Sequence, residues 1–234
     1  MSEPRTPPSV FETSSAPPMD ERRTAFIVHT YNYVFASILA FVALEVVLFK
    51  TGFAEVMWQF VQRTSWLLIL GGFMLIGWIA RPIAWRVEHL GAQYAALGIF
   101  IAAEAVLFTV PLYWAQSQMP DAITKSAWIT LAGFAALTAV VFLTRKDFSF
   151  LRGILVWGGI LALIAIVVGV LFGFSLGLWF SVAMVALAGA GILYDTSKIL
   201  RGFPADRPVA AALELFASIM LMFWYVLRIV RSRD

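Results

Sequence analysis

The sequence predicts an all-α integral membrane protein in which seven transmembrane helices form one bundle. Of its 234 residues, 61% are hydrophobic and only 13% are charged, and the mean hydropathy is +0.86. About a quarter of the residues of a soluble domain are charged, so this chain lacks the polar surface that a water-soluble globule needs. The apolar residues are gathered into seven stretches along the chain. A chain of this length is expected to form one bundle rather than several domains.

Residues 1–24 are predicted to form a disordered cytoplasmic tail. They hold five of the ten prolines together with Ser, Thr, Glu and Arg, and they contain no apolar run that could build a core. The first apolar run begins too late and is too long for a signal peptide. At the other end of the chain, residues 231–234 form a short basic tail.

The transmembrane domain is predicted over residues 25–230. A helix needs roughly 20 apolar residues to cross the hydrocarbon core. The second stretch is the shortest, and it spans the membrane only if Arg81–Trp85 snorkel to the interface. The predicted spans cover residues 25–49, 65–80, 90–114, 127–144, 153–174, 176–194 and 209–230.

Two connections have a predicted shape. Apolar residues recur at helical spacing in TGFAEVMWQFVQRT, residues 51–64, which predicts a short helix lying in the membrane interface. The fifth and sixth spans are separated by almost no residues, so they are expected to form a tight antiparallel hairpin.

The basic residues predict the orientation in the membrane. Lys and Arg are more numerous in the tail and in the loops on the same side as the N-terminus, which places that terminus in the cytoplasm and the C-terminus outside. The basic C-terminal tail opposes this orientation. The formal net charge of +3 is small and lies in clusters at span ends, which suits lipid headgroups rather than nucleic acid. The chain has no cysteine, which excludes disulfides and thiolate chemistry.

Charged residues within the spans are candidate functional residues, because an ionised group at mid-bilayer costs on the order of 3 kcal/mol. Glu45 lies near the outer end of the first span and is expected at headgroup level. Glu104 lies deeper, one to two turns before Pro111, which frees a backbone carbonyl. Glu104 is therefore expected either to form an interhelix hydrogen bond or to line a polar lumen.

Asp195 and Arg81 are predicted at the same depth near the cytoplasmic face, since their spans run in the same direction. An ion pair between them would lower the cost of burying either charge, and protonation of Asp195 would release Arg81. The alternative is two unrelated charges that face water at helix ends. Glu214 and Ser218 are four residues apart and share a helix face that could point toward Asp195.

Five stretches resemble, in order, segments of the Bax inhibitor-1 family (the TMBIM superfamily), especially its bacterial YccA-like branch. They cover the entry to the first span, the third span, a basic loop, the end of the sixth span and the last span. They are RTAFIVHTY (23–31), GIFIAAEAVLFTVPLYWA (98–115), FLTRKDFSFL (142–151), ILYDTSKIL (192–200) and LELFASIMLMFWYVLRI (213–229).

The resemblance implies a seven-helix bundle with the last helix central. Family members are described as proton-gated calcium leaks, in which an arginine on the second helix closes a pair of aspartates on the sixth and seventh. Asp195 matches the first aspartate, and Arg81 falls near the arginine. Ser218, however, stands in the place of the second aspartate, so the acidic pair is broken in this chain.

One hypothesis restores the second carboxylate. Glu214 is one turn from Ser218, and Asp195 with Glu214 would then be the candidate Ca²⁺ ligands, since Ca²⁺ prefers several carboxylate oxygens. No other metal site and no cofactor is predicted; Ca²⁺ or H⁺ would be the transported or sensed ion. The YccA-like branch is similar to this chain in carrying serine at that position, and it is associated with modulation of the membrane-bound AAA protease FtsH.

Two functions therefore follow from the sequence. The chain is either a pH-sensitive cation leak gated by Asp195 and Arg81, or a protein that binds and restrains a membrane-bound AAA protease. An enzyme is not expected, because the sequence has no HExxH motif and no second intramembrane aspartate in a GxGD context. The expected location is the bacterial inner membrane, and the oligomeric state is left open.

Overall fold

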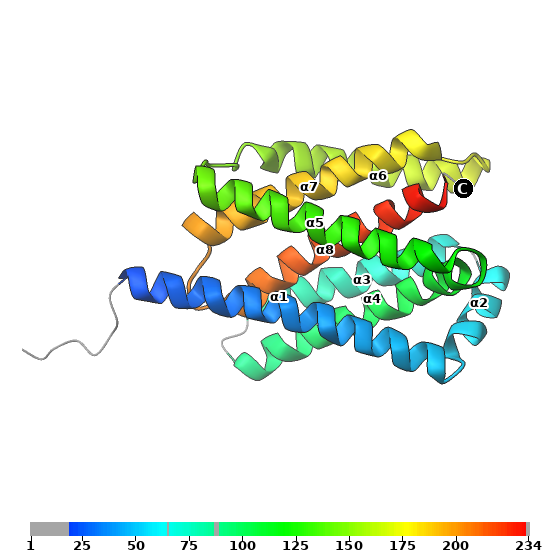
Figure 1. Ribbon diagram of the computed structural model, residues 1–234, viewed down its shortest axis with the longest axis horizontal. Helices are drawn as coiled ribbons and strands as arrows, with labels where there is room; N and C mark the ends of the chain where they lie inside the picture. Colours follow the sequence, from blue (N-terminus) through cyan, green and yellow to red (C-terminus); the bar gives the residue numbers. More distant parts are fainter. Residues whose placement is uncertain (1–18, 65, 87–88, 233–234) are drawn as a thin grey trace, which may run out of the picture.

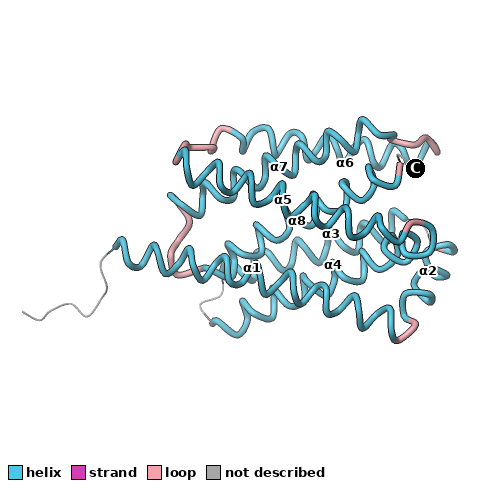
Figure 2. The backbone as a smooth tube through the Cα atoms, in the orientation of Figure 1, coloured by secondary structure: helices cyan, strands magenta, loops and turns pink. Residues whose placement is uncertain are grey.

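The computed structural model describes residues 19–64, 66–86 and 89–232. This part of the chain is almost entirely helical and contains no strand (Figures 1 and 2). The predicted all-α class is therefore confirmed. The helices are α1 (Met19–Lys50), α2 (Phe53–Arg63), α3 (Trp66–Arg86), α4 (Leu90–Gln118), α5 (Pro120–Thr144), α6 (Leu151–Phe172), α7 (Gly177–Arg201) and α8 (Pro208–Arg231).

Within the described residues, 6 helices are long and apolar enough to cross a membrane, namely α1 and α4 to α8. α3 has 21 residues and is not among these 6 helices. The structure thus supports an integral membrane protein, whereas a seventh span over residues 65–80 stays a prediction. The predicted helix between the first two spans is present as α2. It follows Gly52, whose φ of 76° lies in the left-handed region that glycine adopts without steric strain because it has no Cβ.

The N-terminal helix begins earlier than predicted. Residues 19–24, which we assigned to the disordered tail, form the first turns of α1, and residues 1–18 lie outside the described part. The cause is tertiary. Arg23 donates from Nη1 to the Phe203 carbonyl at 2.5 Å and from Nε to the Leu200 carbonyl at 3.2 Å, and it also bonds the Ile199 carbonyl. These contacts satisfy carbonyls that the end of α7 leaves unpaired.

The hairpin between α6 and α7 is tight, as predicted. Gly173 and Gly177 adopt φ values of 73° and 63°, which reverse the chain within a few residues. The helix that follows continues to Arg201, beyond the predicted end of the span at Tyr194. Its last two turns stay helical because they are covered by protein: Thr196 and Ile199 are buried. Asp195 therefore lies inside a helix, not at its terminus.

The last helix lies in the interior of the bundle. α8 packs against α1, α3, α4, α5 and α7, and 72% of its most apolar window is buried. Aromatic contacts join it to α4, with Phe108 stacked on Phe223 at 5.4 Å between ring centroids and edge-on to Trp224 at 5.1 Å. By contrast, only 6% of the apolar window of α6 is buried. α6 therefore stands at the edge of the bundle, and a pocket separates it from α4.

The two described ends of the chain lie at opposite ends of the bundle (Figure 1). Since the spanning helices run end to end, such an arrangement places the start of α1 and the end of α8 on opposite sides of a membrane. The predicted topology, with seven spans, likewise has the two termini on opposite sides. Which end faces the cytoplasm stays a prediction.

Candidate gating site

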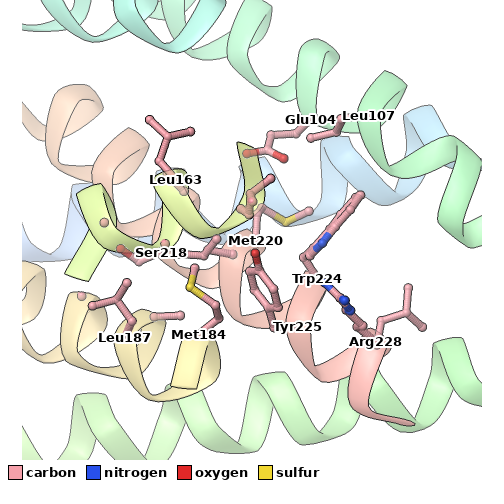
Figure 3. Close-up of a pocket in the computed structure, with 18 of the residues that line it drawn as sticks. Glu104, Leu107, Leu163, Met184, Leu187, Ser218, Met220, Trp224, Tyr225 and Arg228 are labelled. Carbon is pink, nitrogen blue, oxygen red and sulfur yellow. The ribbon is translucent and has the colours of Figure 1, made fainter. Parts of the chain in front are cut away.

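A pocket of about 1210 Å³ runs along one side of α8. Its walls come from α3, α4, α6, α7 and α8, and on α8 its lining extends from Glu214 to Ser232. At a rise of 1.5 Å per residue this segment covers roughly 27 Å, close to the thickness of a bilayer core of about 30 Å. The pocket therefore follows the bundle for most of the depth of a membrane. Figure 3 shows Glu104, Ser218 and Arg228 around it.

Asp195 lies in the wall of this pocket. It is only 8% exposed, and its Oδ2 accepts a hydrogen bond from Ser218 Oγ at 2.7 Å. A glycine permits this contact: a Cβ on Gly191, one turn before Asp195, would lie 3.0 Å from Ser218 Oγ. The bond joins α7 to α8, and it places Ser218 next to Asp195, at the position where the resemblance places the family's second aspartate.

Arg81 lines the same pocket from α3 but stands apart from Asp195. Its side chain is exposed, and among the ion pairs of the described residues none joins it to Asp195. The carboxylate of Asp195 is already bonded to Ser218, and α3 has far fewer contacts with α8 than α7 has. The two predicted partners thus share a pocket without a direct bond in this structure, and gating by the pair stays a prediction.

Glu214 is engaged elsewhere. Its Oε2 pairs with Lys198 Nζ at 2.9 Å, and its Oε1 accepts a hydrogen bond from Trp85 Nε1 at 2.8 Å. Lys198 also lies over the rings of Trp85 and Phe203, at 4.8 Å from each centroid. We call Trp85, Lys198, Phe203 and Glu214 the cytoplasmic-end cluster, after the predicted orientation of the chain. It fastens α3 to α7 and α8 one turn beyond Arg81.

The sequence analysis missed this cluster. Trp85 was expected only to snorkel to the interface at the end of its span, and no partner was predicted for Lys198. A usable signal was present, since the connection between α7 and α8 is short and puts Lys198 and Glu214 at the same end of an antiparallel pair. With both oxygens of Glu214 already bonded, the hypothesis that Glu214 supplies a second Ca²⁺ carboxylate requires Lys198 to move away first.

The two remaining acidic residues differ in setting. Glu104 is 5% exposed and lines the pocket, with its carboxylate on the pocket side in Figure 3; whether it serves an interhelix hydrogen bond or a polar lumen stays a prediction. Glu45 is 7% exposed and its Oε2 accepts a hydrogen bond from Thr109 Oγ1 at 3.4 Å. The structure thus packs Glu45 against α4, instead of leaving it open to the headgroups as we expected.

Together these observations define the class: an all-helical membrane protein whose bundle holds a long pocket with a buried aspartate and several basic residues in its wall. Residues 23–234 match the family described as "Inhibitor of apoptosis-promoting Bax1". The chain belongs to the Bax inhibitor-1 family.

Several curated relatives are similar to the chain. It is 32% identical over 119 residues to the Escherichia coli "Modulator of FtsH protease YccA", which covers 50% of this chain and 54% of that protein. It is 29% identical over 184 residues to the fission yeast "Bax inhibitor 1", covering 73% and 63%. A membrane protein of Vibrio cholerae is 29% identical over 149 residues, covering 63% and 62%. The matched part thus spans about half to two thirds of the length of each relative, and none of these descriptions is that of an enzyme.

Proposed function

We propose that the chain is a proton-sensitive cation leak, in which the pocket is the pathway and Asp195 with Arg81 is the gate. The observation that carries the proposal is the position of Asp195: it is buried, and it lies in the wall of a pocket that extends for most of a bilayer's depth. A carboxylate buried within a membrane-spanning bundle is costly, so such a residue is a functional candidate by default.

Electrostatics supplies the gating step. An ionised Asp195 attracts Arg81 across the pocket, because opposite charges interact strongly where water is scarce. This attraction draws α3 toward α7 and α8 and narrows the pathway. Protonation of Asp195 removes the attraction, so the leak rises as the pH falls. The cytoplasmic-end cluster acts as the hinge of this motion, since it holds α3 one turn beyond Arg81.

The cation preference follows from the ligands. Ca²⁺ takes 6–8 oxygen ligands, whereas Asp195 and Ser218 together offer one carboxylate and one hydroxyl at this point of the pathway. With Lys198 bound to Glu214, the site suits weak, transient contact with a passing cation rather than tight binding. The proposal therefore assigns Ca²⁺ as a cargo of a leak and not as a resident metal.

Ion flux from proteoliposomes between pH 5 and 8 tests the proposal. The wild type is expected to leak faster at low pH. Asp195→Asn and Arg81→Gln are expected to leak at a high rate that no longer depends on pH, because each removes one half of the gate. Asp121→Asn, an exposed carboxylate on α5, serves as the control and keeps the wild-type profile. A flat wild-type profile, or an unchanged Asp195→Asn profile, would contradict the proposal.

A second function, restraint of a membrane-bound AAA protease, is favoured by the Escherichia coli relative that is named a modulator of FtsH protease. For this function we propose an inner-membrane location with residues 1–18 as a cytoplasmic handle. Deletion of residues 2–18 leaves α1 and the Arg23 contacts in place, so the fold survives. If the deletion variant no longer co-purifies with the protease but shows normal ion flux, residues 1–18 contribute to protease binding. If it still co-purifies normally, these residues are not the handle.

A further inference from the structure

The end of the pocket opposite the cytoplasmic-end cluster carries two arginines. Arg228 and Arg231 are three residues apart on α8, so they share one face of the helix, and both line the pocket. Arg231 lies over Trp114 of α4, with its guanidinium carbon 3.7 Å from the ring centroid. Figure 3 shows Arg228 beside Trp224 in the same wall.

These two cations lack an anionic partner within the described residues. The ion pairs found there involve Lys125, Lys198 and Arg207 instead. Nε of Arg231 is buried and has no hydrogen-bond acceptor. The dipole at the end of α8 compensates cations only partly, by about 0.3–1 kcal/mol each. Two partly buried like charges at one pocket mouth therefore attract an anion.

The pocket beneath the arginines is apolar over the depth of one lipid leaflet. From Leu221 to Arg231 the helix rises roughly 15 Å, half of a hydrocarbon core of about 30 Å. Leu107 and Pro111 of α4 and Ile166 and Val170 of α6 form the facing walls. The whole pocket, at about 1210 Å³, exceeds the roughly 300–1,000 Å³ of small-molecule sites, which leaves room for a hydrocarbon chain.

We propose that this end of the pocket binds one anionic phospholipid, with its phosphate between Arg228 and Arg231 and an acyl chain against α4, α6 and α8. A guanidinium fork bonds a phosphate in bidentate geometry, and the apolar depth fits a chain of one leaflet. The membrane supplies such lipids at high local concentration. This inference does not rest on the proposed leak, but a lipid bound there would lie in the same pocket and would obstruct that end of the proposed pathway.

Native mass spectrometry of the purified chain in neutral detergent tests the site. Phosphatidylglycerol and phosphatidylcholine with identical acyl chains are titrated separately, and glycerol phosphate is the chain-free probe. We expect one phosphatidylglycerol to bind at least about tenfold more tightly than phosphatidylcholine, the scale of a charge-assisted bond, and glycerol phosphate to bind undetectably. Equal affinity for the two phospholipids, or equal binding of glycerol phosphate, would overturn the proposal.

Two pairs of substitutions distinguish lipid binding at this site from nonspecific attraction to the charge of the protein surface. Arg228→Gln with Arg231→Gln should abolish the preference for phosphatidylglycerol. The matched control, Arg63→Gln with Lys125→Gln, removes two exposed cations from the same end of the bundle without touching the pocket, and should keep it. A preference that survives the first pair, or disappears equally in the control, would contradict the site. Arg228→Lys with Arg231→Lys checks folding, and should retain a weaker preference.

Discussion

The hydrogen bond from Trp85 to Glu214 predicts a measurable coupling between α3 and α8. Trp85→Phe keeps an aromatic ring against Lys198 and Phe203 but removes the Nε1 donor 2.8 Å from Glu214 Oε1. A hydrogen bond to a charged group contributes about 1.5–3 kcal/mol. The side chain of Glu214 keeps 21% exposure, so water partly replaces the lost donor. We therefore expect the lower end, about 1–1.5 kcal/mol.

The assay is a double-mutant cycle on unfolding in mixed detergent micelles, with Trp85→Phe, Glu214→Gln and the double variant. Residues in direct contact should show a coupling energy of roughly 0.5–3 kcal/mol. Trp128→Phe is the control, since Trp128 is 69% exposed on α5 and its loss should have little effect. A coupling below about 0.3 kcal/mol, or an equal loss in the Trp128 variant, would refute the role of the cluster in holding α3.

Three further predictions use other contacts. Ser218→Asp places a carboxylate against Asp195 and should strengthen Ca²⁺ binding in isothermal titration, whereas Ser218→Asn should not; equal affinities would refute the broken-pair interpretation. Gly191→Ala should destabilise the fold, because its Cβ would lie 3.0 Å from Ser218 Oγ. The Cβ of Gly159→Ala meets nothing within 4 Å, so this variant should gain up to about 1 kcal/mol from the higher helix propensity of alanine. The reverse order of the two variants in thermal unfolding would contradict the geometry. Arg23→Met should lower the unfolding free energy by about 1–3 kcal/mol through unpaired α7 carbonyls, with Arg23→Lys intermediate; unchanged unfolding of both would show that the contact is unimportant.

Much of the fold was readable from the pattern of apolar residues. The α6–α7 hairpin and the short α2 were predicted because they depend on local chain properties: run length, turn residues and helical spacing. The helix boundaries at Met19 and Arg201 were not predicted. Both depend on a contact between the two ends, where Arg23 of α1 meets the carbonyls of α7, and no local pattern reports a partner that is so distant in sequence.

The candidate site divides in the same way. A paired Asp195 and its approach to Ser218 were among the alternatives that the sequence left open, because a carboxylate at the end of an apolar segment and a serine on the next helix are visible in the chain. The partner of Glu214 was missed. Its choice of Lys198 and Trp85 over Asp195 depends on how α3 and α8 rotate about their axes, and that rotation is set by packing.

The sequence by itself determined that this chain is a membrane protein, since it has too few charged residues to form the surface of a water-soluble domain. It also indicated where most helices begin and turn, and that Ser218 lies on a helix face that could point toward Asp195. Only the tertiary structure decided which charges pair, because ion pairs form between side chains that helix rotation brings within a few ångströms. It left Arg81, Arg228 and Arg231 in the wall of one pocket without an ion pair among the described residues, and it paired Glu214 with Lys198.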